Sequence, residues 1–515
     1  MNMKKQLLSI AAVVTMISAS AVALTDPAAE PDPSVMAAAY YQIWNDDVQK
    51  AIDERIEKYR KADATVELTD IKPGTDVQVE QLTHAFFFGA NIYNFNQLGT
   101  TERNEKYKAL YGTLFNSATI PFYWKSFEME PGKPRFKTEE RDTEEFWNNV
   151  ENPKKQPHWR RPATDEVVEF CKSKGIRMHG HTIIWGDRND GRPTWLFDYA
   201  SNPFPEEREV LLKAYKQIYN QPGTMSPEEI YKLGPNYFDS MNELYWNRIR
   251  MLAEHYKETL DSWDVVNESS VDYHGNAVTG DKVTKSPCYR HSMPGDYTYN
   301  SFKIAQEVFP ESVQLVINDY ANNQNYVNQV KDLIAHGTKI DIVGSQMHMV
   351  KPQNAQDIAA GKVVSSVGGV KMTPEGIMST MKLLASNGRP IHISEVTVPM
   401  PSEDEKGKAV QAIIARDLYR MWFSVPEIMG ITLWSVVDGC GWPGESRFGI
   451  FTRDMEPKPS YYALNKLINE EWKTNFVQKA DAENVTLQFR GFKGKYRVTW
   501  TDKNGQAQSK EFTVK

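Results

Sequence analysis

From residue 84 onward, short apolar runs alternate with longer stretches of helical periodicity, and this alternation limits the possible fold more than any other feature. The helical stretches fall at 164–174, 246–260, 300–308, 326–336, 374–387 and 406–424. Eight apolar runs lie around them: Phe86–Ala90, Ser117–Ile120, Arg177–Trp185, Ser262–Val266, Val313–Ile317, Ile340–Val343, Ile391–Ser394 and Gly430–Trp434. Repeated strand–helix units form a parallel sheet, and eight of them can close into a barrel. The sequence therefore predicts an α/β fold, a (β/α)8 TIM barrel over residues 84–475.

The segments that flank the barrel have patterns of their own. Residues 24–83 begin with a Pro/Ala/Asp-rich linker, continue with a helical stretch at 35–62 and end in two alternating runs around Lys72-Pro73-Gly74. These runs predict a β-hairpin, and we expect the helix and hairpin to cap the bottom of the barrel. Residues 476–515 alternate again and predict a small β segment. Its Tyr496 and Trp500 could form an aromatic platform for sugar, but packing into a core is the simpler interpretation because so short a module needs one.

The N-terminus has the layout of a secretory signal peptide. Two lysines, Lys4 and Lys5, precede an apolar stretch that ends in the small-residue pattern Ala21-Val22-Ala23. The alternative is a membrane anchor, but the apolar stretch is short and interrupted by Ser and Thr. We therefore predict a signal peptide over residues 1–23, a secreted or periplasmic mature protein and no membrane span.

Composition removes several classes of function. The net charge of −7 argues against a nucleic-acid partner, which would require a clustered basic surface. Cys171, Cys288 and Cys440 are widely separated, so one disulfide is possible but no pairing is indicated. The histidines show no metal-binding spacing. We expect a monomer that needs neither metal nor other cofactor.

Two of the predicted strands end in a glutamate. Glu268 follows the run Trp263–Asn267, and Glu395 follows Ile391–Ser394, 127 residues later. That interval leaves room for three strand–helix units, which would place the glutamates on strands four and seven of the barrel, at its active-site face. Glycoside hydrolysis requires such a pair, one carboxyl protonated and one ionised. A separation of about 5–5.5 Å gives retention and about 6.5–9.5 Å gives inversion. A surface glutamate at the end of a strand is the common alternative for either residue alone.

The ordered set of motifs resembles glycoside hydrolase family 10, best known for endo-β-1,4-xylanases. The resemblance covers roughly residues 84–470 and rests on these motifs: Gly180-His181-Thr182-Ile183-Ile184-Trp185, Trp263-Asp264-Val265-Val266-Asn267-Glu268, Asn318-Asp319-Tyr320, Gln346-Met347-His348, Ser394-Glu395, Trp434-Ser435-Val436-Val437-Asp438, Trp442 and Lys458-Pro459. Each motif alone is weak, but their order is specific. The resemblance implies a (β/α)8 barrel and a retaining mechanism.

The resemblance also implies a role for individual residues. Glu268 matches the acid/base and Glu395 the nucleophile. Asn267 matches the residue that bonds the sugar 2-hydroxyl, and His348 the histidine that holds the nucleophile. The other positions that match sugar-binding residues are Lys125, His181, Trp185, Gln346, Trp434 and Trp442. Asn318 and Asp319 could instead be hydrogen-bonding residues at a strand end, without contact to sugar.

The chain departs from the family pattern on the glycone side. The family's Glu-Asn pair is replaced by Pro121-Phe122, which would change the hydroxyl groups that this subsite satisfies. Gly186-Asp187-Arg188 follows Trp185 where the family tends to have His and Gln, and His179 replaces the usual arginine. Arg188 could bind an anionic or heavily hydroxylated substituent, or could be a surface arginine. The long segments 186–245 and 269–298 are expected to shape the cleft.

These observations predict a retaining, endo-acting β-glycoside hydrolase of xylanase type that cleaves β-1,4-xylan or a related polysaccharide by double displacement. A hydrolase specific for a decorated or non-xylan β-glycan is the first alternative. A non-catalytic carbohydrate-binding protein on a hydrolase barrel is the second, and the presence of both glutamates with Asn267 and His348 argues against it.

Overall fold

A computed structural model describes residues 31–152, 162–187, 191–220, 227–273, 275–277, 297–440 and 447–515, with only the backbone at 215–220 and 227–228. The predicted signal peptide, Arg188, Cys288 and Trp442 lie outside the described residues. Within the described part, no helix is long and apolar enough to cross a bilayer.

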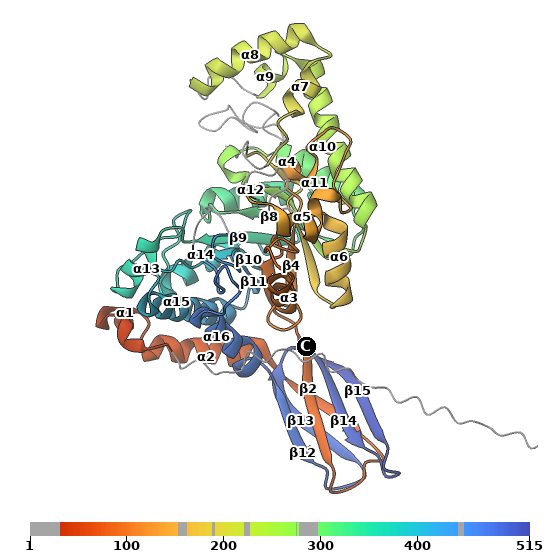
Figure 1. The fold of residues 1–515 in the computed structure, drawn as a ribbon, viewed down its shortest axis with the longest axis vertical. Helices are drawn as coiled ribbons and strands as arrows, with labels where there is room; N and C mark the ends of the chain where they lie inside the picture. The colour runs from red at the N-terminus through yellow and green to blue at the C-terminus, as the bar shows by residue number, and fades with distance from the viewer. Residues whose placement is uncertain are drawn as a thin grey trace, which may run out of the picture.

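Parallel strands close into the predicted barrel (Figure 1). They are β3 (Phe87–Asn91), β4 (Ser117–Pro121), β5 (Arg177–His181), β6 (Ile184–Trp185), β7 (Ser262–Asn267), β8 (Gln314–Asp319), β9 (Ile342–His348), β10 (Ile391–Thr397) and β11 (Ile428–Leu433). β5 and β6 share one position because both pair with β7, and the β5–β7 pairing closes the ring. The expected eight strand positions are confirmed, with β5 and β6 as one interrupted strand.

Helices connect successive strands and cover the outside of the barrel. The main ones are α3 (Thr101–Ala109), α6 (Thr164–Ser173), α10 (Pro235–Tyr256), α11 (Tyr297–Val308), α12 (Gln324–Ala335), α14 (Pro374–Ala385), α15 (Glu405–Ser424) and α16 (Pro459–Lys466). Shorter helices are α4 (Trp124–Phe127), α5 (Glu144–Asn149) and α13 (Pro352–Ala359). Because helices cover one face of the strands and the barrel core fills the other, every residue of β7, β9 and β10 is buried.

Large side chains fill the layer between the strands and the surrounding helices. Trp263 of β7 is fully buried, and its ring lies 4.6 Å from that of Phe122. A Cβ atom at Gly180 would come within 2.2 Å of the Trp263 ring, so only glycine fits at this position of β5.

The segment after β6 is a helical extension rather than the long loop suggested by its Asn, Pro and Gly content. It contains α7 (Leu196–Ser201), α8 (Pro205–Asn220), α9 (Pro227–Tyr231) and the start of α10, and in Figure 1 it projects from the barrel. Arg248 of α10 is buried and donates from Nε to the carbonyl of Ile183 at 2.7 Å, and from Nη2 to the carbonyl of Phe122. These contacts tie α10 to the chain that leaves β4 and β5.

The two ends of the chain build one β unit together (Figure 1). β1 (Lys61–Leu68) pairs with β13 (Val485–Phe492), and a second sheet has the order β12 (Asn475–Lys479), β2 (Asp76–His84), β14 (Gly494–Thr501), β15 (Ala507–Val514). Apolar side chains from both sheets share one core.

The predicted N-terminal hairpin is therefore wrong, because β1 and β2 belong to different sheets. Val66 and Leu68 of β1 and Val77 and Val79 of β2 all lie in the common core, so the turn between the two strands joins two layers instead of two neighbours. The packing interpretation of Tyr496 is confirmed: its ring is 0% exposed and stacks on Phe512 at 5.5 Å.

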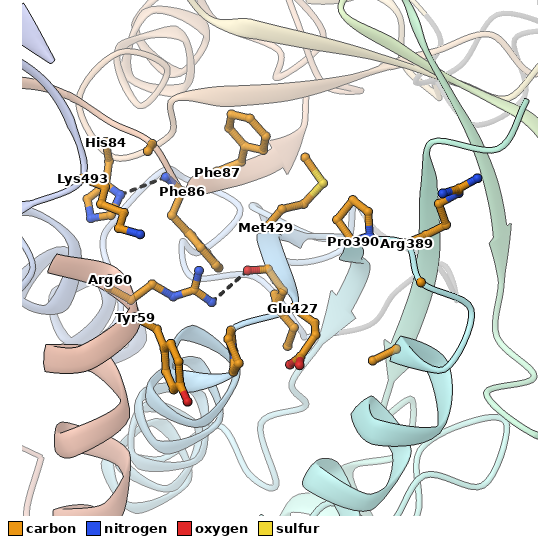
Figure 2. A pocket seen from close by; sticks show the side chains of 15 residues that line it. Tyr59, Arg60, His84, Phe86, Phe87, Arg389, Pro390, Glu427, Met429 and Lys493 are labelled. Atoms are coloured by element: carbon orange, nitrogen blue, oxygen red, sulfur yellow. Dashed lines mark hydrogen bonds between the residues drawn. The ribbon is translucent and has the colours of Figure 1, made fainter. Parts of the chain in front are cut away.

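The N-terminal helix α2 (Asp46–Arg60) lies at the bottom of the barrel, as expected. Its Arg60 donates from Nη2 to the carbonyl of Ile428, the first residue of β11, at 2.8 Å. Beside it lies a pocket of about 530 Å³. Figure 2 shows Tyr59, Arg60 and Phe87 around this pocket. Because Phe87 is the first residue of β3 and Ile428 the first of β11, the pocket lies at the amino ends of the strands, opposite to the carboxyl ends that hold the two glutamates.

A buried histidine in the barrel predicts that acid destabilises the fold. His392 is 5% exposed, and burial, together with the positive charges of His179 and Arg177, lowers its pKa from 6.5 to about 3. The unfolded chain therefore binds more protons between pH 6.5 and pH 3, and the stability present above pH 6.5 is lost as the pH falls, by up to about 1.4 kcal/mol per unit. Urea unfolding at pH 7 and pH 5 should show that His392→Gln loses less stability on acidification than the wild type, by about 1–2 kcal/mol. Equal losses would contradict this account of His392.

Candidate active site

The two glutamates lie at the carboxyl ends of their strands. Glu268 directly follows β7, and Glu395 is in the second half of β10, in register with Gln346 of β9. Glu268 has a φ of +57°, in the left-handed region that side chains other than glycine rarely adopt. Its backbone N–H donates to the carbonyl of Asn318 at 2.7 Å, which fixes this turn. Such conformations gather at functional sites, where neighbouring structure stabilises them.

The surroundings of Glu268 suit an acid. Trp185 donates from Nε1 to its Oε2 at 3.0 Å, and Gln346 donates from Nε2 to its Oε1 at 3.1 Å. Burial, followed by the negative charges of Glu395 and Asp319, raises the pKa of Glu268 to about 8, although the two hydrogen bonds act in the opposite direction. The carboxyl therefore carries a proton at neutral pH, as a group that must protonate a leaving oxygen has to do.

Glu395 is held by donors on both oxygens. Asn318 donates from Nδ2 to Oε1 at 2.9 Å, and Nε2 of His348 lies 3.0 Å from Oε2. The other ring nitrogen of His348 lies 3.3 Å from the hydroxyl of Thr397, which helps to fix the ring. The side chain of Glu395 is thereby oriented and its negative charge is stabilised, as a nucleophile requires.

Asn318 links the two halves of the site. The same Nδ2 that contacts Glu395 also donates to Oδ1 of Asn267 at 2.9 Å, and Oδ1 of Asn318 accepts from Ser394 at 2.6 Å. A Cβ atom at Gly344 would lie 2.2 Å from this Oδ1, so glycine leaves the space that Asn318 occupies. The sequence left open whether Asn318 contacts sugar; in the structure its amide is occupied by Asn267, Glu395 and Ser394.

The role of Asp319 was also undecided from the sequence, and in the structure its side chain holds the neighbouring loop backbone by hydrogen bonds. Its carboxylate accepts from the backbone N–H groups of Ser270 at 2.9 Å and of Ala321 at 2.8 Å. It acts on Glu268 only through its charge.

A buried ion-pair cluster lies beside the two glutamates. Oδ2 of Asp264 lies 2.7 Å from Nδ1 of His181 and 2.9 Å from Nε2 of His179. Burial alone would raise the pKa of Asp264, but the two histidines outweigh it and hold that pKa well below its usual range. For His181, burial is outweighed by the hydrogen bond to Asp264 and by the charge of Glu395, which raise its pKa. The raised pKa favours the protonated form of His181, and Glu395 contributes to this shift.

Aromatic rings pack against the histidines of the site. The ring of Trp434 lies 5.1 Å from that of His181, 6.3 Å from that of His348 and 5.4 Å from that of Tyr93. Tyr123 contacts the rings of His181 at 5.3 Å and Trp185 at 5.6 Å. Sequence analysis missed Tyr93 and Tyr123. Both tyrosines lie two residues after the end of a barrel strand, β3 or β4. Residues just after a strand end lie at the active-site face, which is the rule that identified Glu268, so the sequence did contain a signal for them.

The structure corrects the interpretation of Pro121-Phe122. Phe122 is 0% exposed, and its ring packs on Trp263 at 4.6 Å and Tyr256 at 5.4 Å, so it faces the core and not a sugar subsite. The next side chain, Tyr123, lies at the cleft instead. Lys125 is half-buried on α4, two residues further along.

The structure therefore brings together Glu268, Glu395, Asn267, Gln346, His348, His181, Trp185 and Trp434. Arg188 and Trp442 lie outside the described residues. Among the residues that the structure describes, no group of three or more His, Cys, Asp or Glu side chains is arranged to hold a metal ion.

The chain is similar to several known proteins. The model of the family described as Glycosyl hydrolase family 10 matches residues 79–467. Endo-1,4-beta-xylanase C of Paenibacillus barcinonensis is 25% identical over 370 residues, which are 68% of this chain and 28% of that protein. Endo-1,4-beta-xylanase B of Thermotoga neapolitana is 22% identical over 61% of this chain and 87% of its own length. The crystal structure of native xylanase 10B from Thermotoga maritima is 19% identical, with a TM-score of 0.49 over 75% of this chain and 96% of that chain.

Proposed function

The chain belongs to glycosyl hydrolase family 10, and on this premise we propose that it is a retaining β-glycoside hydrolase of xylanase type that cleaves within β-1,4-xylan or a related β-linked polysaccharide. Glu268 is the acid/base and Glu395 the nucleophile. The observation that supports the proposal is that the two carboxyl groups have different surroundings. Burial and the charge of Glu395 raise the pKa of Glu268 to about 8, whereas the carboxylate of Glu395 receives two hydrogen bonds.

The geometry supports a first step in which Glu395 attacks the anomeric carbon while Glu268 gives its proton to the departing oxygen. His348 and Asn318 keep the attacking carboxylate oriented, and Trp185 and Gln346 hold the acid. Asn267 and His181 lie next to the pair, where they can bind hydroxyls of the same sugar. Burial is the main cause of the raised pKa of Glu268, and the charge of Glu395 adds to it; as Glu395 becomes an uncharged ester, this added contribution is lost and Glu268 can act as a base.

In the second step, Glu268 accepts a proton from water, which attacks the sugar bound to Glu395 from the face that the leaving group vacated. Two displacements at one carbon restore its configuration. No step needs a metal or another cofactor, since the two carboxyls and water account for every proton and bond.

The raised pKa of Glu268 predicts the alkaline limb of the activity profile. Below about pH 8 the acid is protonated, so kcat/KM on a natural oligosaccharide should be nearly constant, and it should fall up to about tenfold per unit at higher pH. Initial rates at low substrate concentration from pH 6 to pH 10 measure this. The residual activity of Glu268→Gln, which has no group to titrate there, should lack the limb. A limb centred below pH 6.5 would contradict the assignment.

The substrate is proposed from the relatives, since the similar proteins of Paenibacillus barcinonensis and Thermotoga neapolitana are both endo-1,4-beta-xylanases by name. The test is product analysis on a panel of xylan, arabinose- or uronic-acid-decorated xylan, mixed-linkage glucan, cellulose and mannan. Cleavage of xylan supports the proposal. Cleavage of another glycan without cleavage of xylan would replace it by the non-xylan alternative.

We propose a secreted or periplasmic location, supported by the order of Lys4, Lys5 and the apolar stretch that ends at Ala21-Val22-Ala23. N-terminal sequencing of the exported protein tests it and should show a start near Leu24.

A further inference from the structure

Four aromatic side chains form what we term the aromatic wall: Tyr93, Tyr123, Trp185 and Trp434. They come from the carboxyl ends of β3, β4, β6 and β11, whereas Glu268 follows β7 and Glu395 lies on β10. Trp185 belongs to the wall and also donates a hydrogen bond to Glu268. The Tyr93 ring lies 5.4 Å from that of Trp434 and 5.8 Å from that of Tyr123, and both contacts are close to perpendicular, at 74° and 82°. The wall therefore follows neighbouring strand positions of the barrel, from β11 through β3 and β4 to β6, and it meets Glu268 at Trp185.

The wall begins at the nucleophile. Trp434 contacts His348, whose Nε2 lies 3.0 Å from Glu395, and Tyr123 contacts His181, which is within electrostatic range of Glu395. In the proposed mechanism the sugar that becomes bound to Glu395 is the first glycone sugar. The wall therefore lies on the glycone side of the bond that is cleaved.

Three of the four rings of the wall are buried against one another, and the fourth, Trp185, is half-buried. Tyr93 is 2% exposed, Trp434 6% and Tyr123 7%, and the hydroxyls of the two tyrosines lie 3.4 Å apart. A sugar can stack only on a ring face that it can reach. Among the described residues, two positions next to the wall offer no free polar group: Phe122 packs into the core, and the side-chain amide of Asn91 donates to the carbonyl of Trp434.

We infer that the aromatic wall makes Tyr93 and Tyr123 specificity-determining residues, which leave the second glycone sugar with little binding energy. This inference rests on the proposed function. The enzyme binds the substrate chain mainly through the first glycone sugar and the aglycone sugars. A substrate with one glycone sugar should therefore have nearly the same kcat/KM as a substrate with two. Endo cleavage remains compatible with it, because further glycone sugars are weakly held rather than excluded.

Two chromogenic substrates test the inference, 4-nitrophenyl β-xyloside and 4-nitrophenyl β-xylobioside, which differ only in the second glycone sugar. We expect their kcat/KM values to agree within about fivefold, whereas a formed subsite with two or more hydrogen bonds would favour the xylobioside by about 100-fold or more. A ratio of that size would overturn the inference while leaving the hydrolase assignment intact. Failure to cleave either substrate would overturn the xylanase-type function, and the inference with it.

Two variants of Tyr123 test whether the aromatic wall causes the weak binding of the second glycone sugar. Tyr123→Phe keeps the ring and should keep the ratio of the two kcat/KM values. Tyr123→Ala removes the ring and opens space beside His181 and Trp185, so the xylobioside should gain on the xyloside by about threefold or more. The readout is the ratio of the kcat/KM values of two substrates, measured on the same protein sample. A smaller fraction of folded protein lowers both values equally and leaves the ratio unchanged. An unchanged ratio in Tyr123→Ala would contradict the role of the wall.

Discussion

Replacing Glu395 with alanine is expected to lower kcat on every β-glycan substrate by at least about 10⁴-fold, because no other group is placed to attack the anomeric carbon. Sugar binding should remain, since Asn267 and His181 are unchanged. Turnover on oligosaccharides and binding by calorimetry measure the two effects separately. The matched control is Glu375→Ala, which removes an exposed glutamate of α14 and should retain full activity.

Adding azide to Glu395→Ala tests whether Glu395 is the nucleophile. In Glu395→Ala the anion can occupy the vacated space and attack an activated aryl β-glycoside directly, a single displacement that gives the α-glycosyl azide. The non-catalytic carbohydrate-binding alternative would be supported by a different result: the wild-type protein and the variant would both be inactive on all glycans and would bind them equally well.

Replacing Glu268 with glutamine should have the second largest effect, and its size should depend on the leaving group. On oligosaccharides, whose leaving oxygen needs a proton, kcat/KM is expected to fall by about 10²–10⁴-fold. On an aryl glycoside with an acidic phenol the first step needs little proton donation, so kcat/KM should fall much less. The second step then lacks its base, and the glycosyl enzyme should accumulate and appear as a burst of phenol.

Azide distinguishes the two glutamates at this step. With Glu268→Gln the anion should attack the sugar already bound to Glu395, and the product should be the β-glycosyl azide. Equal losses of kcat/KM for oligosaccharides and aryl glycosides, without a burst, would contradict the acid/base role of Glu268.

Sequence reasoning identified the features of the site that depend on position along a strand. Glu268 and Glu395 could be found because an apolar run that ends in a carboxylate places it at the barrel mouth, and no knowledge of packing was needed. Tyr93 and Tyr123 follow the same rule, but tyrosines are equally common in cores, so the pattern did not separate them from core residues. Asn318 was ambiguous for a similar reason: only its contacts with Glu395 and Asn267 reveal its place.

The failures of sequence reasoning concern interactions that are distant in the chain. The N-terminal runs were interpreted as a hairpin because they are adjacent, yet β1 pairs with β13, more than 400 residues away, and β2 pairs with β12 and β14. Local alternation shows that a strand has one apolar face, but it does not show which strand completes the sheet. The direction of Phe122 also could not be read from the sequence, because it depends on the space beside Trp263.

The same chemistry predicts which anomer of the sugar is released first. A nucleophile at Glu395 and an acid/base at Glu268 imply two displacements at one carbon, so the first product must keep the β configuration. Proton NMR of the new reducing end, recorded within minutes of adding protein to a xylo-oligosaccharide, measures this before mutarotation mixes the anomers. We predict that the β-anomer signal appears first and the α-anomer signal grows only later. Initial appearance of the α-anomer would contradict the retaining pair.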